Sequence, residues 1–353
     1  MKRKILFSLV AVMMVAGLVV GCAAPAPAPA PAPTPAPAPT PAPTPTPAVK
    51  PITLKAVMFW PYRPQNPLHK AWADLMVEGI KERSKGELIV NLMGGPEVIP
   101  AFDQIEALRT GMLDLSLIAT SYANNIIPET DAWAASDFKG GEERKIGFND
   151  YANKLFGEKG LFYLGRVDSG DMVLFSREKV IEEPYTGFRG MKYSGGGTMW
   201  IPFMKKLGIV FSVVSIGEAY TGLQHGVFDG CCANSTSGAA QGYGEVCKYR
   251  INHPFWPGDC ANVMSLQTWK KLPKHLQDIL MEQQIKMETT FPPLIKGMEE
   301  YEVVQLTKQG CKQLEFKPAD AAWFVKTAFD AKWEEMQEKT PASYPKLREM
   351  LRK

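Results

Sequence analysis

The chain has 353 residues, a formal net charge of +3, and a composition of 45% hydrophobic and 22% charged residues. Its basic residues form no long block, so neither charge nor composition indicates a nucleic-acid-binding protein. About 300 residues follow the N-terminal region, which is enough for two lobes with their own hydrophobic cores.

The N-terminus predicts export. Basic residues at positions 2–4 precede an apolar run over residues 5–20, which ends at Gly21 and Cys22. A basic start, a short apolar run and small residues at its end are typical of a signal peptide, here residues 1–21, and the run is short for a membrane span. The position of Cys22 fits a bacterial lipobox and predicts lipidation; the alternative is an ordinary signal peptide with an incidental cysteine.

Residues 22–50 form the next predicted segment, a linker behind the lipidated cysteine. From Pro25 to Pro47 proline alternates with alanine or threonine. Proline removes the backbone donor and fixes φ, so we expect a semi-rigid polyproline II tether without a core. At about 3.1 Å per residue it spans about 70 Å, which favours a domain held away from a membrane.

A first α/β unit is predicted to begin after the linker. Asn66 and Pro67 form a strong helix start, with asparagine as N-cap and proline at the first helical position. Strand-like and helix-like segments alternate as βαβαβ, with strands at 52–59, 88–93 and 113–120 and helices at 67–85 and 102–110. This order predicts a sheet covered by helices on both faces.

A second α/β unit follows, and then a helix-rich C-terminus from Lys274 to Lys353, with a break expected at Pro292 and Pro293. The second unit is predicted to contain strands at 161–167, 172–176, 191–193, 210–214 and 227–232 and helices at 199–207 and 217–225.

One pattern occurs in both units. Leu108 to Asp114 and Leu223 to Asp229 share the sequence L-x-x-G-x-x-D. Each predicts a helix end, a glycine in the left-handed C′ position and a turn into a strand. Such a turn recurs in many α/β proteins, but here it also supports two similarly built lobes with a cleft between their strand ends.

Motifs of catalysis and cofactor binding are missing from the sequence. It has no G-x-S-x-G, H-E-x-x-H, Walker A or dinucleotide-binding motif, and its four histidines have no metal-ligand spacing. We therefore expect no metal and no cofactor, and a binding protein in place of an enzyme.

Five cysteines follow Cys22, an odd number that cannot pair fully within one chain. A Cys247–Cys260 disulfide and free buried cysteines both remain open. The adjacent Cys231 and Cys232 are interpreted either as small residues that close a strand or, with less support, as a redox or soft-metal pair.

The segment Ser194 to Thr198 is a glycine-rich loop between a predicted strand and a predicted helix. Its bare backbone N–H groups are suited to approach a ligand, and a helix N-terminus favours an anionic oxygen. A connector without a ligand is the alternative.

Several motifs resemble those of the substrate-binding proteins of TRAP transporters. The most specific is the run from Glu218 to Gly230, E-x-Y-T-x-L-Q-x-G-x-x-D-G. Weaker motifs occur in the family's order over Ile52 to about Gly310. They lie at residues 66–69, 104–114, 187–192 and 206–208.

The resemblance implies a two-lobed periplasmic-binding-protein fold of the α/β class, with a ligand cleft between the lobes and a helix-rich C-terminus. It implies lobe 1 at residues 51–168, lobe 2 at 169–260, and a return to lobe 1 with the C-terminal helices at 261–353. It also implies capture of a small organic ligand by cleft closure, delivery to the membrane subunits of a TRAP permease, and an extracytoplasmic location at the lipid anchor.

The sequence departs from the family at the ligand's usual anchor. Two arginines commonly bind a carboxylate there, but this chain has Ser194 at one position and Asp171 near the other. Losing a bidentate guanidinium costs a carboxylate ligand several kcal/mol. The ligand is therefore expected to be an apolar or aromatic compound, or an atypical organic acid held by other donors.

The predicted ligand-binding residues follow the ends of the predicted strands. Aromatic residues would stack on the ligand, and serine, threonine and asparagine would donate hydrogen bonds. The set comprises Trp60, Tyr62, Ser121, Tyr122, Asp168, Asp171, Tyr193, Ser194, Gly196, Thr198, Cys231, Cys232, Asn234 and Trp256. Two other classes remain: a ligand-sensing lipoprotein receptor of the same fold, and, with no supporting motif, an exported enzyme.

Overall fold

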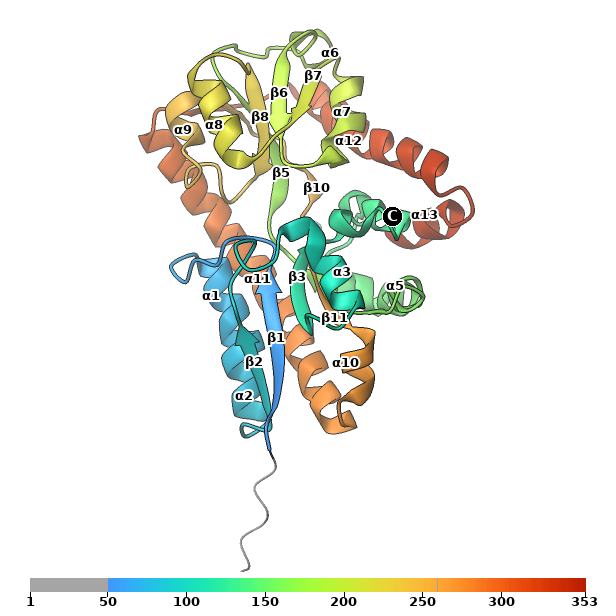
Figure 1. Ribbon diagram of the computed structural model, residues 1–353. Helices are drawn as coiled ribbons and strands as arrows, with labels where there is room; N and C mark the ends of the chain where they lie inside the picture. Colours follow the sequence, from blue (N-terminus) through green and yellow to red (C-terminus); the bar gives the residue numbers. More distant parts are fainter. Residues whose placement is uncertain (1–49, 259) are drawn as a thin grey trace, which may run out of the picture. The chain divides into compact units, whose positions relative to one another are not determined.

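Two mixed β-sheets organise the protein in the computed structural model, which describes residues 50–258 and 260–353 (Figure 1). The signal peptide, Cys22 and the proline-rich linker lie outside the described residues. Lobe 1 is built on a five-stranded sheet of order β2-β1-β3-β11-β4, and lobe 2 on a seven-stranded sheet of order β12-β9-β5-β8-β6-β7, in which β10 also pairs with β5.

In lobe 1, β1 is parallel to β2 and β3, and β11 runs antiparallel between β3 and β4. The strands are β1 (Ile52–Met58), β2 (Leu88–Leu92), β3 (Leu115–Ala119), β4 (Leu161–Val167) and β11 (Cys260–Ser265). Helical segments are α1 (Pro67–Ala73), the π-helical η1 (Asp74–Gly79), α2 (Ile80–Arg83), α3 (Gln104–Arg109), α4 (Gly140–Lys145), α5 (Phe148–Gly157) and α10 (Leu266–Lys271), with 3₁₀ turns η2 (Ala101–Asp103), η3 (Thr120–Ala123) and η4 (Pro128–Ala135).

In lobe 2, β6 lies parallel to β7 and β8, while β5 is antiparallel to β8, β9 and β10. The strands are β5 (Asp171–Ser176), β6 (Lys192–Gly195), β7 (Val210–Val213), β8 (Gly230–Asn234), β9 (Tyr249–Ile251), β10 (Phe255–Pro257) and β12 (Lys312–Leu314). Its helices are α6 (Pro184–Gly187), α7 (Ile201–Lys206), α8 (Ile216–Gln224) and α9 (Tyr243–Val246), with the 3₁₀ turn η5 (Thr198–Trp200). The C-terminal helices α11 (Lys274–Lys308), α12 (Pro318–Lys339) and α13 (Tyr344–Leu351) contribute side chains to cores of both lobes.

Each sheet has an apolar core on both faces, which confirms the predicted α/β class. In β1, Ala56 and Met58 belong to one core while Val57 belongs to the core on the opposite face. In lobe 2, Cys232 and Cys231 divide in the same way between two cores. Successive side chains along a strand point to opposite faces, and this division follows because both faces of each mixed sheet are covered.

The start of α1 confirms the predicted cap. Asn66 accepts hydrogen bonds through Oδ1 from the backbone N–H groups of Leu68 at 2.9 Å and His69 at 3.3 Å, and Pro67 follows as the first helical residue. The helical stretch then runs through a π-helical turn to Arg83 and is followed by Gly86, as the sequence predicts.

The repeated L-x-x-G-x-x-D pattern forms the same turn twice. Gly111 and Gly226 both have φ of 73°, the left-handed conformation that glycine adopts without strain. In each lobe the carboxylate of the aspartate accepts a hydrogen bond at 2.8 Å from a backbone N–H of a neighbouring strand. The donor is Lys55 for Asp114 and Lys192 for Asp229. The two lobes thus contain the same helix-to-strand turn.

The prediction of a break at Pro292 and Pro293 is wrong, because α11 is one 35-residue helix that contains both prolines. Its first half packs in the lobe 1 core through Met287 and Phe291, and Leu306 near its end packs in a lobe 2 core. After α11, β12 joins the lobe 2 sheet beside β9, whereas the sequence assigns this region to lobe 1 and the C-terminal helices.

Candidate functional site

The predicted lobe 1 residues leave the sheet at one edge. Cys260, the first residue of β11, pairs with Ala119 at the end of β3 and with Val167 at the end of β4. The ends of β3 and β4 therefore lie two strand spacings apart, about 10 Å. Ser121 follows the end of β3, and Asp168 follows the end of β4. The end of β1 lies beside β3, so Trp60 and Tyr62 follow from the same edge.

The lobe 2 edge gathers a second part of the predicted set. Met172 of β5 pairs with Asn234 at the end of β8, and Asp171 precedes it. Because β6 is parallel to β8, Gly196 and Thr198 follow β6 at this same edge. Asp171 is also fixed through its backbone: its N–H donates to Ser235 Oγ at 3.0 Å, and its carbonyl accepts the Ser235 N–H at 2.7 Å.

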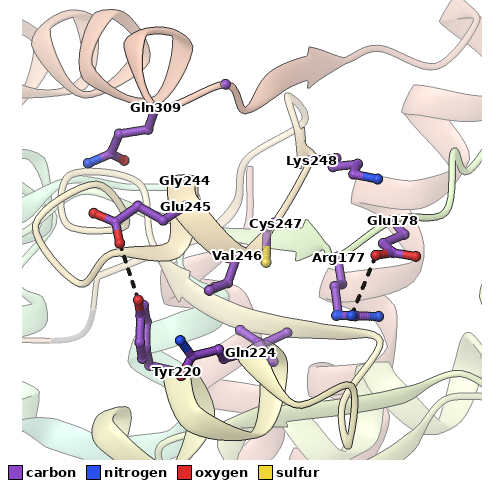
Figure 2. Close-up of a pocket in the computed structure, with 12 residues that line it drawn as sticks. Arg177, Glu178, Tyr220, Gln224, Gly244, Glu245, Val246, Cys247, Lys248 and Gln309 are labelled. Atoms are coloured by element: carbon purple, nitrogen blue, oxygen red, sulfur yellow. Dashed lines mark hydrogen bonds and ion pairs between the residues drawn. The ribbon is translucent and has the colours of Figure 1, made fainter.

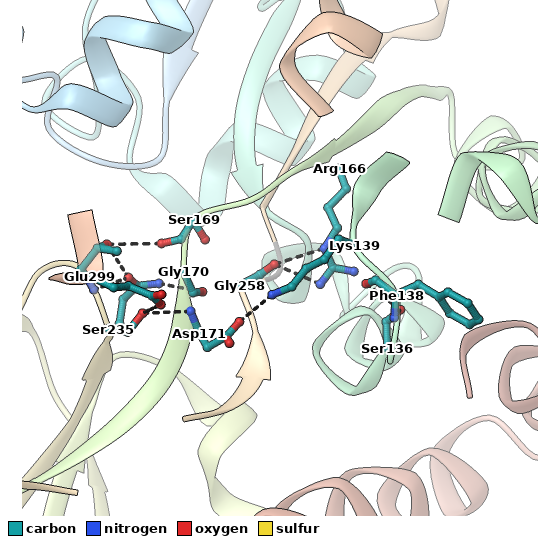
Figure 3. A network of polar contacts seen from close by, with 12 residues as sticks. Ser136, Phe138, Lys139, Arg166, Ser169, Gly170, Asp171, Ser235, Gly258 and Glu299 are labelled. Atoms are coloured by element: carbon teal, nitrogen blue, oxygen red, sulfur yellow. Dashed lines mark hydrogen bonds and ion pairs between the residues drawn. The ribbon is translucent and has the colours of Figure 1, made fainter. Parts of the chain in front are cut away.

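Residues 168–170, which we call the crossing, connect the end of β4 to the start of β5. Figure 3 shows Ser169 and Gly170 in this segment. Gly170 has φ of 94°, and a Cβ there would lie 2.8 Å from Ser235 Oγ. A Cβ on Gly258, in the returning segment, would lie 2.0 Å from Ser169 Oγ. Both glycines are therefore required by close backbone approach at the crossing.

Aromatic side chains form a cluster at the lobe 1 edge that includes three predicted residues. Tyr122 lies 5.7 Å from Phe59 and 4.3 Å from Phe102, measured between ring centroids, and Phe59 lies 4.0 Å from Trp60. Trp60 and Tyr62 both stack on the His69 ring, at 5.5 and 6.2 Å. We call Phe59, Trp60, Tyr62, His69, Phe102 and Tyr122 the aromatic shelf. Phe102 is absent from the predicted set although it is 66% exposed.

An ion pair joins the α4 start to the first residue of β5. Lys139 Nζ lies 2.8 Å from Asp171 Oδ1, and both side chains are partly exposed (Figure 3). Asp171 therefore already has a cation as its partner. Lys139 was not predicted, because 32 residues separate it from Asp171 and no local pattern marks it.

A second ion pair, between Arg166 of β4 and Glu143 of α4, is buried next to the crossing. Arg166 Nη1 donates to Glu143 Oε1 at 2.5 Å, and its Nη2 donates to the carbonyl oxygens of Trp133 at 2.8 Å and Gly258 at 3.0 Å. Both charged side chains are almost fully buried. Burial raises the pKa of Glu143, and the neighbouring Arg166 opposes that effect.

Asp168 is a further carboxyl group at the crossing. Its side chain is 7% exposed, and no described residue donates a hydrogen bond to its Oδ2. Burial raises its pKa, and the charges of Arg166 and Lys139 counteract this. The site thus carries acceptor capacity that none of the described residues uses.

Five of the predicted residues are both buried and within strands. Ser194 is fully buried because β6 extends to Gly195, two residues beyond the predicted strand end. Trp256 packs in a lobe 2 core and donates Nε1–H to the Ala328 carbonyl at 2.9 Å. Tyr193, Cys231 and Cys232 are likewise buried in β6 and β8, and a binding role for these five stays a prediction.

A surface cavity of about 450 Å³ lies elsewhere on lobe 2 (Figure 2). Its walls include Arg177, Lys248, Glu178 and Glu245, and Tyr220 donates to Glu245 at 3.2 Å. Arg177 directly follows Ser176 at the far end of β5, so the cavity lies about 20 Å from Asp171. Of the predicted set, none lines this cavity.

Three chemical alternatives find no support in the described part of the chain. Among the described residues, the five cysteines after Cys22 are buried and no disulfide joins them, so the Cys247–Cys260 disulfide is not formed. Residues 50–258 and 260–353 contain no group of three or more His, Cys, Asp or Glu placed to hold a metal ion. Among these residues, no helix is both long and apolar enough to cross a membrane.

Two α/β lobes joined at the crossing form the two-lobed architecture of periplasmic solute-binding proteins. The sequence matches the family described as bacterial extracellular solute-binding protein, family 7, over residues 59–340. The chain belongs to this family.

Curated relatives match part of the chain. A solute-binding protein of Albidiferax ferrireducens is 26% identical over 217 residues, which cover 59% of this chain and 64% of that protein. An uncharacterized protein of Haemophilus influenzae is 28% identical over 206 residues, covering 56% and 59%. The chain therefore aligns with less than two thirds of the length of each.

Solved structures share the fold over most of the chain. A TRAP periplasmic solute-binding protein from Desulfovibrio salexigens, with bound orotic acid, superposes with a TM-score of 0.76 at 16% identity and covers 85% of this chain and 97% of that one. One from Rhodoferax ferrireducens, with bound malonate, gives a TM-score of 0.71 at 22% identity, covering 84% and 96%.

Proposed function

We propose that this chain is the extracytoplasmic solute receptor of a TRAP-type transporter, held at the membrane through a lipid on Cys22. Membership of the solute-binding family and the fold shared with TRAP receptors support the transport role. The basic, apolar and small residues that precede Cys22 support the anchor.

The observation that carries the proposal is the meeting of two sheet edges at the Asp168–Gly170 crossing. A ligand bound there touches both lobes, so its binding free energy differs between separated and closed lobes. Closure is then a ligand-biased hinge motion, and the closed receptor presents both lobes together to a permease.

The ligand is proposed to be a small organic compound with an apolar or aromatic part. The aromatic shelf supplies stacking surface on lobe 1. Thr198, exposed at the lobe 2 edge, supplies a polar contact. The Asn234 side chain instead donates to the Gly170 carbonyl at 3.2 Å and accepts from the Thr236 hydroxyl at 2.7 Å, so a role for it in ligand binding requires that these bonds be exchanged. A simple dicarboxylate is expected to fit poorly, because Asp171 and Ser194 occupy the two positions where the resemblance to the family implies an arginine.

Ligand capture is tested by native mass spectrometry of the purified protein followed by a thermal-shift screen of small solutes. A compound that binds the folded state at 100 times its Kd stabilises it by about 2.7 kcal/mol and raises the midpoint. We expect a co-purified solute or at least one such compound. Absence of both, for a folded protein, refutes the role.

The anchor is tested separately through Cys22→Ser, with Cys247→Ser as the matched control. The wild type and the control are expected in the membrane fraction, and Cys22→Ser in the soluble extracytoplasmic fraction. Equal membrane association of all three proteins contradicts lipidation at Cys22.

A further inference from the structure

Among the described residues at the two sheet edges, the lysine and arginine are paired with carboxylates, and one further carboxyl group has no such partner. Lys139 is paired with Asp171, and Arg166 is paired with Glu143 beneath the crossing. Asp168 stands between these pairs with an Oδ2 that no described group contacts by a hydrogen bond. An arriving carboxylate would meet two aspartates and would have to take Lys139 away from one of them.

The aromatic shelf adds a second, independent feature. Phe102 exposes 66% of its surface although it is a large apolar residue, and it lies against Tyr122 at 4.3 Å. Single exposed apolar residues are common, but this one continues a run of packed rings at the site edge. The faces of aromatic rings carry negative partial charge and attract cations, most strongly when water is excluded.

We propose that the ligand is an organic cation, a protonated amine or a quaternary ammonium with an apolar group, held between Asp171 and the Phe102–Tyr122 part of the aromatic shelf. This inference rests on the proposed function of the chain as a solute receptor. A carboxylate and the faces of aromatic rings both attract positive charge, so Asp171 on lobe 2 and the aromatic shelf on lobe 1 favour the same class of ligand. Lys139, 47% exposed in its side chain, is able to swing away from Asp171 as the cation binds.

Arg63 is the cation through which the opposite ligand class would bind. It is exposed near the aromatic shelf, and its backbone N–H donates to His69 Nδ1 at 3.0 Å. A carboxylate ligand seated on the shelf would rely on Arg63, whereas an organic cation would not.

The test uses four probes with the same ring and different charges: benzylamine, benzyltrimethylammonium, benzyl alcohol and phenylacetate. Binding to the purified protein is measured by calorimetric titration at low salt. We expect the two cations to bind at least about 10-fold more tightly than phenylacetate, with benzyl alcohol between them.

Single substitutions identify the residues that contact the cation. Asp171→Asn is expected to weaken benzylamine binding about 10-fold and benzyl alcohol binding little, whereas Phe102→Ala weakens both. Arg63→Gln leaves cation binding unchanged. Asp330→Asn, in an exposed ion pair with Lys326 on α12, is the matched control for loss of a surface carboxylate.

Tighter binding of phenylacetate than of benzylamine, lost in Arg63→Gln, overturns the inference and leaves the receptor role intact. Unchanged cation binding in Asp171→Asn overturns the assignment of the carboxylate. Failure of all four probes also overturns the inference, and the broader solute screen then decides separately whether the chain is a solute receptor.

Discussion

Arg166 is predicted to stabilise the folded protein next to the crossing. Replacing it with methionine keeps the apolar stem but leaves Glu143 buried without its cation, and it removes a donor from the carbonyl groups of Trp133 and Gly258. Breaking a buried, hydrogen-bonded ion pair costs about 3–5 kcal/mol. We therefore expect Arg166→Met to lower the free energy of unfolding by about this amount.

The pH dependence of Arg166→Met follows from the same contact. Without Arg166, burial alone acts on Glu143 and raises its folded pKa further above its unfolded pKa. A group with a raised folded pKa contributes stability below its unfolded pKa and loses it as pH rises through the folded pKa. The variant is therefore expected to be closer to wild type at pH 4 than at pH 8.

Urea unfolding followed by far-UV circular dichroism and tryptophan fluorescence measures the effect, provided that the two transitions coincide. The double variant Arg166→Met with Glu143→Leu is expected to recover at least about 2 kcal/mol, because an apolar pair has no buried charge. Lys326→Met, from an exposed pair, should change stability by no more than about 0.5 kcal/mol. An Arg166→Met midpoint as close to wild type as this control refutes the reasoning.

Three further predictions concern the shelf and the buried thiols. Burial, with a smaller effect of Arg63, lowers the pKa of His69 from 6.5 to about 4, so the unfolded state binds more protons between these values. Stability should fall as pH drops from 6.5 to 4, by up to about 3 kcal/mol below that range, and His69→Gln should lose this part of the slope in urea titrations. Asn66→Ala should cost about 1 kcal/mol by removing the N-cap of α1, and Asn66→Asp should retain most of it; equal midpoints for the two would contradict the capping role. Burial raises the pKa of the Cys231 and Cys232 thiols well above the usual range, so a colourimetric thiol reagent at pH 8 should label them only after unfolding. Rapid labelling of the native protein would show that these cysteines are reached by solvent.

Most secondary elements could be predicted because their signals are local. The start of α1 depends on two adjacent residues, and the two L-x-x-G-x-x-D turns depend on a glycine and an aspartate at fixed offsets. The α/β class follows from the alternation of strand-like and helix-like segments. Such features need no knowledge of distant contacts.

The wrong predictions concern helix and strand boundaries that are set by contacts between residues distant in sequence. Proline in a helix interior costs about 3 kcal/mol, which is why a break was expected at Pro292 and Pro293. Packing of Phe291 and Ile295 in the lobe 1 core outweighs this cost. Likewise, β8 begins at Gly230, three residues later than predicted, because Val227 and Phe228 belong to the turn closed on Gly222.

The positions of some candidate residues in the fold could be predicted for the same reason. Tyr122 follows the end of β3 and Asp171 begins β5, and both strands have local sequence signals; the binding role of these residues stays a prediction. Ser194 was assigned to a loop, but hydrogen bonding to β7 and β8 extends β6 past it. Lys139 and Phe102 gave no local signal, since their contacts join segments separated by 32 and 20 residues.

The threading of the chain through both sheets affects the order in which the protein is made. The lobe 1 sheet needs β11, which ends at residue 265, to fill the gap between β3 and β4. The lobe 2 sheet needs β12, which ends at residue 314. Neither sheet has all of its strands until these late segments have been synthesised, and pairings this distant in sequence form slowly. For a polypeptide proposed to act outside the cytoplasmic membrane, late completion of both sheets would favour export of the chain before it folds.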